Sequence, residues 1–101
     1  MDLRTECDGA QYTAHLSGQL KYADNGAFRT LVEEMNASKA KRCIFNMSRL
    51  TAIDSAGLGM LVIASDAGKK NGWSLTLQGA SGQVRKILEL SRFDQLMNIA
   101  D

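Results

Sequence analysis

The sequence contains no proline, a single histidine, a single tryptophan and only two cysteines. Since no proline-rich linker, low-complexity segment or internal repeat divides the chain, we expect one domain spanning residues 1–101. No apolar run approaches the roughly 18 residues that a membrane-spanning helix needs, and the chain opens on polar sequence rather than on a signal peptide. These absences favour a cytoplasmic protein without membrane insertion.

Neither sign of charge dominates, because 12 basic residues face 11 acidic ones and the net charge is +1. Such a balance argues against a broad nucleic-acid footprint. The one basic cluster, Lys39, Lys41 and Arg42, is compatible with a phosphate or nucleic-acid contact, but it fits a solvated connector after a helix better. We therefore expect no direct nucleic-acid partner.

Side chains that carry chemistry are scarce as well. Cys7 and Cys43 fall in apparent strands without metal-ligand spacing, so we expect packed, reduced thiols rather than a redox pair. His15 is the sole histidine and lies on the polar side of a strand, as a surface or edge residue does. Because no base accompanies any serine, hydrolase chemistry is not expected. The pattern predicts neither a metal site nor a cofactor, and no enzyme activity.

Hydrophobic periodicity divides the chain into alternating strands and helices. Residues 10–17 alternate apolar and polar side chains, whereas residues 43–45 form the continuous apolar run of a strand covered on both faces. Asp24 or Asn25 is placed to cap the first helix, and Ser81 the last. The expected elements are strands at 3–7, 10–17, 43–45 and 73–77, helices at about 22–37, 54–71 and 82–91, a loop at 46–51 and a short apolar tail at 93–99.

The order β-β-α-β-α-β-α predicts an α/β fold. Strands that flank crossover helices favour a mixed sheet of four to five strands with a parallel centre, packed by three to four helices.

The segment from Ile53 to Gly72 is the most informative stretch of the chain. It opens with a helix N-cap signal, Asp54 or Ser55, and closes with basic residues and Asn-Gly. Its apolar residues exceed what one core contact needs, and we expect Met60 and Ile63 to lie exposed on the early turns.

Two glycines stand in the first turns of this predicted helix. Gly57 and Gly59 each cost about 1 kcal/mol relative to alanine in a helix interior, which suggests that another group approaches the backbone closely. A bare G-L-G matches neither the phosphate-binding loop nor the dinucleotide fingerprint. The glycines therefore indicate a contact surface rather than a cofactor loop.

Ser55 has two interpretations that the local pattern leaves open. A serine at a helix start holds its hydroxyl beside unpaired N–H groups and the positive end of the helix dipole, where a phosphoryl group is tolerated. Phosphorylation there adds about −1.5 to −2 charges beside the apolar surface. Alternatively, Ser55 or Asp54 is only an N-cap, worth about 1 kcal/mol.

The segment N-M-S-R-L-T-A-I-D-S-A-G-L-G-M-L, residues 46–61, resembles the signature of the STAS domain family, specifically of bacterial anti-sigma factor antagonists. The chain length, the element order and the L-S-G-Q-L at residues 16–20 agree with it. The resemblance implies a single STAS domain in which Ser55, after Asp54, is phosphorylated.

What this resemblance implies is partner switching. The unphosphorylated form binds an anti-sigma factor that is also a serine kinase of the GHKL type, phosphorylation releases it, and a metal-dependent serine phosphatase reverses the modification. The implied partner-binding residues are Lys21, Asp24, Asp54, Ser55, Ala56, Gly57, Gly59, Met60 and Ile63.

Two positions depart from the family pattern. Lys21 stands where many members carry an acidic residue, and Asn46 stands where the strand often ends in aspartate. Two other functions stay open at this point: a constitutive STAS scaffold or adaptor in a larger signalling or transport complex, and a nucleotide-binding regulator. The sequence does not fix the oligomeric state.

Overall fold

A computed structural model describes all 101 residues. None of its helices combines the length and the apolar character that crossing a bilayer requires. The elements in chain order are β1 Asp2–Asp8, β2 Gln11–Leu20, the 3₁₀ turn η1 Tyr22–Asp24, α1 Asn25–Ser38, β3 Arg42–Ile53, α2 Ser55–Asn71, β4 Ser74–Gln78, α3 Gly82–Leu90, the 3₁₀ turn η2 Phe93–Gln95 and β5 Asn98–Ala100.

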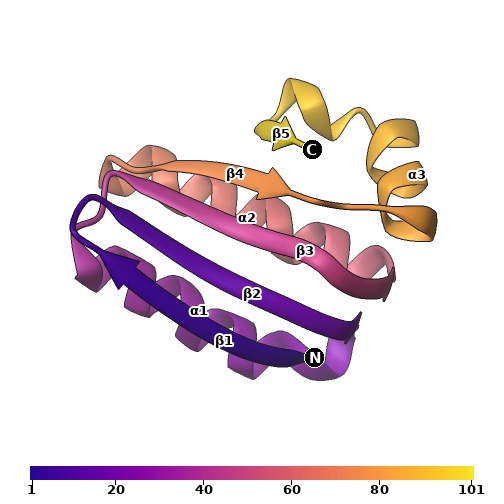
Figure 1. Cartoon of the computed structure of the whole chain (residues 1–101), viewed down its shortest axis with the longest axis horizontal. Helices are drawn as coiled ribbons and strands as arrows, with labels where there is room; N and C mark the ends of the chain where they lie inside the picture. Colours follow the sequence, from indigo (N-terminus) through magenta and orange to yellow (C-terminus); the bar gives the residue numbers. More distant parts are fainter.

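The strands form one five-stranded sheet in the order β1-β2-β3-β4-β5. β1 pairs antiparallel with β2, and the remaining neighbours pair parallel. α1 and α2 lie side by side behind the sheet in Figure 1, whereas α3 lies beyond the end of β4. The predicted mixed sheet with a parallel centre is confirmed, and the opposite face of the sheet is left without a helix.

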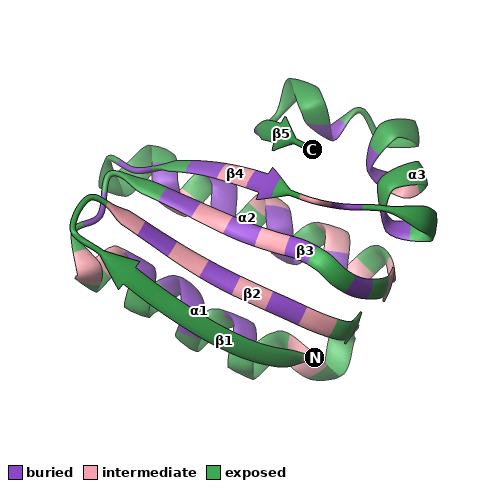
Figure 2. Ribbon diagram, in the orientation of Figure 1, coloured by how far each residue is buried: buried purple, intermediate pink, exposed green.

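The core lies between the sheet and the helix pair. Along β2, buried Tyr12, Ala14 and Leu16 alternate with half-buried polar residues that face away from the helices, which appears as banding in Figure 2. Phe28 of α1 meets Phe45 of β3 edge to face, with ring centroids 5.5 Å apart. The apolar tail, which forms η2 and β5, also contributes to the core, because Phe93 and Met97 are buried.

The predicted loop at residues 46–51 is wrong, because β3 continues without interruption to Ile53. Its register against β2 shifts twice, between the pairs His15↔Asn46 and Ser17↔Arg49 and again between Gly18↔Leu50 and Gln19↔Ala52. Each shift inserts an extra residue into β3, which breaks the period-2 alternation that marks a strand in sequence.

Three smaller expectations also need correction. The Asp24 side chain does not cap α1, and the Ser81 hydroxyl does not cap α3, although Ser81 occupies the N-cap position. Cys7 is exposed rather than packed, because β1 is an edge strand that the helices leave uncovered; Cys43 is buried as expected. Lys39 and Lys41 lie exposed between α1 and β3, and Arg42 is exposed at the first position of β3, in agreement with a solvated connector.

Candidate functional site

The N-terminus of α2 is built around the carboxylate of Asp54. Its Oδ1 accepts a hydrogen bond of 2.8 Å from the backbone N–H of Gly57, and Asp54 occupies the N-cap position with extended backbone dihedrals. A carboxylate in this place satisfies one of the unpaired donors of the first turn and complements the helix dipole. Asp54 is therefore the cap, and the hydroxyl of Ser55 forms no hydrogen bond.

A second set of bonds ties this helix start to the end of β2. Oδ2 of Asp54 accepts a long hydrogen bond of 3.4 Å from the backbone N–H of Tyr22, and the N–H of Asp54 donates to the carbonyl of Leu20 at 3.3 Å. The strand–helix corners before α1 and before α2 therefore share one carboxylate. A displacement of either corner disturbs the other.

The backbone of Gly57 lies in close contact with this corner. A Cβ on Gly57 would stand 2.6 Å from the carbonyl oxygen of Leu20 and 2.6 Å from Cγ1 of Ile53. The close approach that the sequence predicts is real, but it is made by the chain's own β2 and β3. Gly57 is buried, so it does not lie on the exposed surface where the sequence placed it.

The Lys21–Asp24 segment forms the rim of the site. Oδ2 of Asp24 accepts from the backbone N–H of Lys21 at 2.9 Å, and Oδ1 accepts from the N-terminal ammonium at 3.1 Å. The hydrogen bond from Lys21 lowers the pKa of Asp24 most, with a further contribution from the ammonium group. Asp24 thus holds the backbone turn, while the Lys21 side chain is exposed.

An exposed stripe runs along α2 from its first residue. Ser55, Gly59 and Ile63 follow at spacings of four, so they lie on one face of the helix, and all three are exposed; Ile63 keeps 62% of its surface accessible. A Cβ on Gly59 would meet nothing within 4 Å. We call these three residues the α2 stripe; Ala56, next to its start, is half-buried.

Met60 is not exposed, contrary to the expectation from sequence. Only 4% of its surface is accessible, because it lies on the buried side of α2 together with residues 57, 61, 64 and 68. Two apolar faces that look alike in sequence differ here, since Ile63 points away from the core and Met60 into it.

A small groove of about 180 Å³ lies between α1 and α2 beside the stripe. Its apolar lining residues are Phe28, Val32, Met60 and Ile63, so Met60, although buried, borders the groove; Arg29 and Glu33 are among its polar lining residues. Sequence reasoning missed the α1 side of this groove, and it missed Tyr22, which is 74% exposed at the rim. The available signal for Tyr22 was its position at the start of the helix expected at 22–37, outside the apolar spacing that marks the buried face of that helix.

A family model described as "Mlab, STAS domain" matches residues 3–98. The chain belongs to the STAS domain family. A STAS-domain containing protein of Pseudomonas aeruginosa (strain UCBPP-PA14) is 34% identical to this STAS domain over 94 residues, which cover 92% of this chain and 91% of that protein.

Solved structures share the fold at low sequence identity. A putative anti-sigma factor antagonist from Thermotoga maritima superposes with a TM-score of 0.87 at 18% identity, covering 98% of this chain and 86% of that one. SpoIIAA, a Bacillus cell fate determinant, in its phosphorylated form gives 0.74 at 20% identity, covering 99% and 92%. A sulfate transporter family protein from Wolinella succinogenes gives 0.78 at 19% identity, covering 91% and 77%. The likeness to anti-sigma factor antagonists is confirmed, and the same fold also serves transporters.

Proposed function

We propose that this STAS domain is a cytoplasmic anti-sigma factor antagonist, a regulator rather than an enzyme, that switches partners through phosphorylation of Ser55. Without phosphate it binds an anti-sigma factor that is also a serine kinase of the GHKL type. Phosphorylation releases that protein, and a metal-dependent serine phosphatase restores binding.

The observation that carries this proposal is that Asp54 and Ser55 have different roles at the start of α2. Asp54 caps α2, whereas the Ser55 hydroxyl is exposed and forms no hydrogen bond. A kinase can therefore modify Ser55 without removing an interaction that the fold needs. The first turn of a helix also tolerates a phosphate electrostatically.

The surroundings of Ser55 explain why a phosphate would release a partner. A dianion at Ser55 adds charge next to the carboxylate of Asp54, at the start of the exposed α2 stripe that ends at Ile63. A partner that covers Ile63 and fills the groove against α1 must then desolvate that dianion or keep it at a distance.

Phosphorylation of Ser55 is tested with a purified GHKL-type serine kinase from the same organism, ATP and intact-mass measurement. We expect one added phosphoryl group on the wild type and none on Ser55→Ala. Ser81→Ala is the matched control, because Ser81 is also an exposed serine at a helix start. If Ser55→Ala is labelled like the wild type, the assignment of Ser55 is wrong.

The contact surface is tested by the affinity of the same kinase for unphosphorylated variants. Ile63→Ala should weaken binding about tenfold, as burial of a well-placed apolar anchor predicts, without lowering the melting temperature. Leu90→Ala is the control, since Leu90 is a 74% exposed leucine on α3, away from the α2 stripe. Equal effects of the two substitutions would place the interface elsewhere.

A second function has a specific observation in its favour, namely the match to the Mlab-type model and the fold shared with transporter proteins. In that case the chain is a constitutive subunit of a transport complex and Ser55 stays unmodified. Intact mass of the protein purified from its own cells separates the two. A phosphorylated species supports the switch, and a single unmodified species that co-purifies with transport subunits supports the subunit role.

A further inference from the structure

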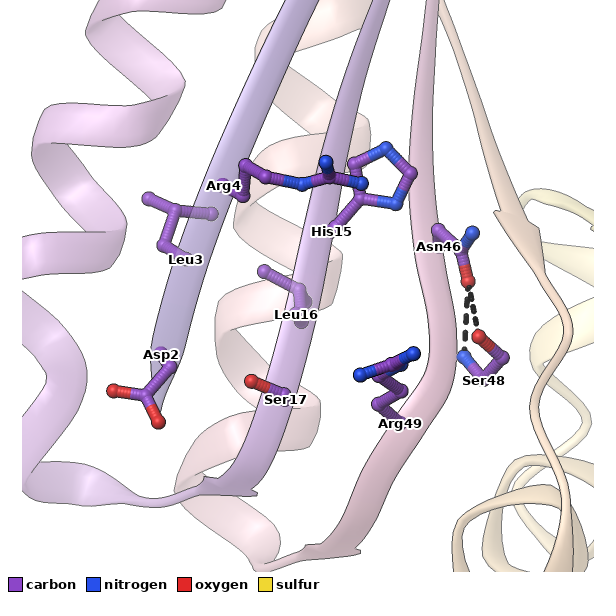
Figure 3. A pocket seen from close by; sticks show the side chains of 9 residues that line it. All are labelled: Asp2, Leu3, Arg4, His15, Leu16, Ser17, Asn46, Ser48 and Arg49. Carbon is purple, nitrogen blue, oxygen red and sulfur yellow. Dashed lines mark hydrogen bonds between the residues drawn. The ribbon is translucent and has the colours of Figure 1, made fainter.

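The helix-free face of the sheet carries a polar concavity of about 650 Å³ over β1, β2 and β3. Its hydrogen-bonding side chains include Arg4, His15, Ser17, Asn46, Ser48 and Arg49 (Figure 3). This volume lies in the range of small-molecule sites. We call it the Arg4–Arg49 concavity; it lies on the opposite face of the sheet from α1 and α2 and plays no part in the proposed switch.

A β-bulge builds one wall of the concavity. Between His15↔Asn46 and Ser17↔Arg49, β3 advances by three residues while β2 advances by two. Ser48 and Arg49 are consecutive and both exposed, whereas Met47 and Leu50 on either side are buried. A regular strand would direct one of the two toward the core. The bulge thus places a hydroxyl and a guanidinium together, as bulges beside binding sites do.

Two guanidinium groups approach the concavity from different strands. In Figure 3, Arg4 reaches from β1 across β2 to His15, and Arg49 projects from β3 toward Ser17. The Arg4 guanidinium already contacts Oε1 of Glu6 at 3.5 Å, but no carboxylate pairs with Arg49. The guanidinium of Arg49 is therefore unpaired at the edge of a cavity. A guanidinium group binds carboxylates and phosphates through two parallel hydrogen bonds.

One further polar group in the concavity lacks a partner. Oδ1 of Asn46 accepts from the N–H and the hydroxyl of Ser48, at 3.0 and 2.8 Å, which orients the amide and leaves its Nδ2 donor without a bond in the protein. Nε2 of His15 is shielded from solvent and lies 3.4 Å from Oε1 of Glu6. The free amide donor at the cavity points to a missing ligand or water.

We propose that the Arg4–Arg49 concavity binds a small organic oxyanion, a phosphate- or carboxylate-bearing metabolite, with Arg49 as its anchor. The Ser17 and Ser48 hydroxyls and the Asn46 amide supply neutral donors, and Arg4 supplies the N–H groups that Glu6 does not occupy. Asp2, the remaining carboxylate at the cavity, points away from Arg49 in Figure 3.

The test is a titration followed by amide NMR shifts at constant pH and ionic strength, in a Ser55→Ala background so that phosphorylation plays no part. The probes are inorganic phosphate, glycerol 3-phosphate and succinate. We expect saturable shifts confined to residues around 15–17 and 46–49 for at least one probe. Preference for the phosphoester or for the dicarboxylate identifies which class of metabolite the site takes.

Three variants make the assignment specific. Arg49→Ala should weaken binding about tenfold or more, as loss of a charge-assisted bidentate contact does. Glu6→Gln should strengthen it, because it frees Arg4. Arg42→Ala is the control, since Arg42 lies on the same strand and the same face but outside the concavity. The absence of saturable shifts, or equal losses for Arg42→Ala and Arg49→Ala, would overturn the proposal.

Discussion

The carbonyl oxygen of Leu20 lies 2.6 Å from the position that a Cβ on Gly57 would take, whereas a Cβ on Gly59 would contact nothing within 4 Å. Two glycines two positions apart therefore have different physical roles. Gly57 allows β2 to reach the first turn of α2, and Gly59 keeps the α2 stripe free of side-chain bulk between Ser55 and Ile63.

Alanine at these two positions should change stability in opposite directions. Gly57→Ala forces a methyl group into backbone and should lower the free energy of unfolding by about 1–3 kcal/mol. Gly59→Ala should raise it by up to about 1 kcal/mol, because alanine is the better helix former and space is available. Urea unfolding of both variants measures these changes in the free energy of unfolding. Stabilisation by Gly57→Ala would show that the corner between β2 and α2 is looser than described.

Removal of the helix cap should lower the free energy of unfolding more than removal of the proposed phosphorylation site does. Asp54→Ala loses the bond from Gly57 and should destabilise the protein by about 1 kcal/mol. Ser55→Ala should leave stability unchanged, since the hydroxyl makes no hydrogen bond. Ser55→Asp should gain up to about 1 kcal/mol from the helix dipole while losing kinase binding. Thermal unfolding of the three variants compares them, and a loss of stability in Ser55→Ala would make Ser55 a structural residue.

Acid should destabilise the protein in part through Asp24. The pKa of this carboxyl lies below its ordinary value of 3.8 in the folded state, mainly because the N–H of Lys21 donates to the carboxylate. A lowered folded-state pKa contributes stability above the unfolded-state pKa, and this contribution is lost as the pH falls below about 4. Asp24→Asn should flatten the acid side of the stability curve measured by urea unfolding between pH 2 and 7. Asp66→Asn, an exposed carboxylate of α2 without an ion pair, should leave that slope unchanged.

The two cysteines should differ in reactivity with a thiol reagent. Cys7 is exposed on the edge strand, and burial raises the pKa of the Cys43 thiol to about 12. Since the thiolate is the reactive form, native protein near neutral pH should react at one thiol per chain and unfolded protein at two. Cys7→Ser should abolish the native-state reaction. Rapid labelling of Cys43 in the native protein would contradict its burial.

Local patterns were sufficient to predict most elements. Alternation along residues 11–17 marked β2, and the Asp54 signal with Asn71–Gly72 marked both ends of α2, because period and capping chemistry act within a few residues of each other. The same reasoning failed for residues 46–51, where two inserted residues hide a strand that only its neighbour β2 defines. The Asn46–Leu61 motif predicted the family correctly because it combines a strand, a capped helix and glycines in one short stretch.

What the sequence by itself determined is the α/β element order, the start of α2 and the serine that begins it. The tertiary structure alone decided that Asp54 rather than Ser55 is the cap, that Met60 is buried while Ile63 is exposed, and that Gly57 packs against Leu20 of β2. The contact of Gly57 depends on Leu20 of β2, which lies more than thirty residues earlier in the chain, and the burial of Met60 depends on how α2 packs in the fold, which local sequence does not specify. The grouping of Arg4, His15 and Arg49 on one face arises in the same way, because sheet pairing and a bulge bring together residues that share no local pattern.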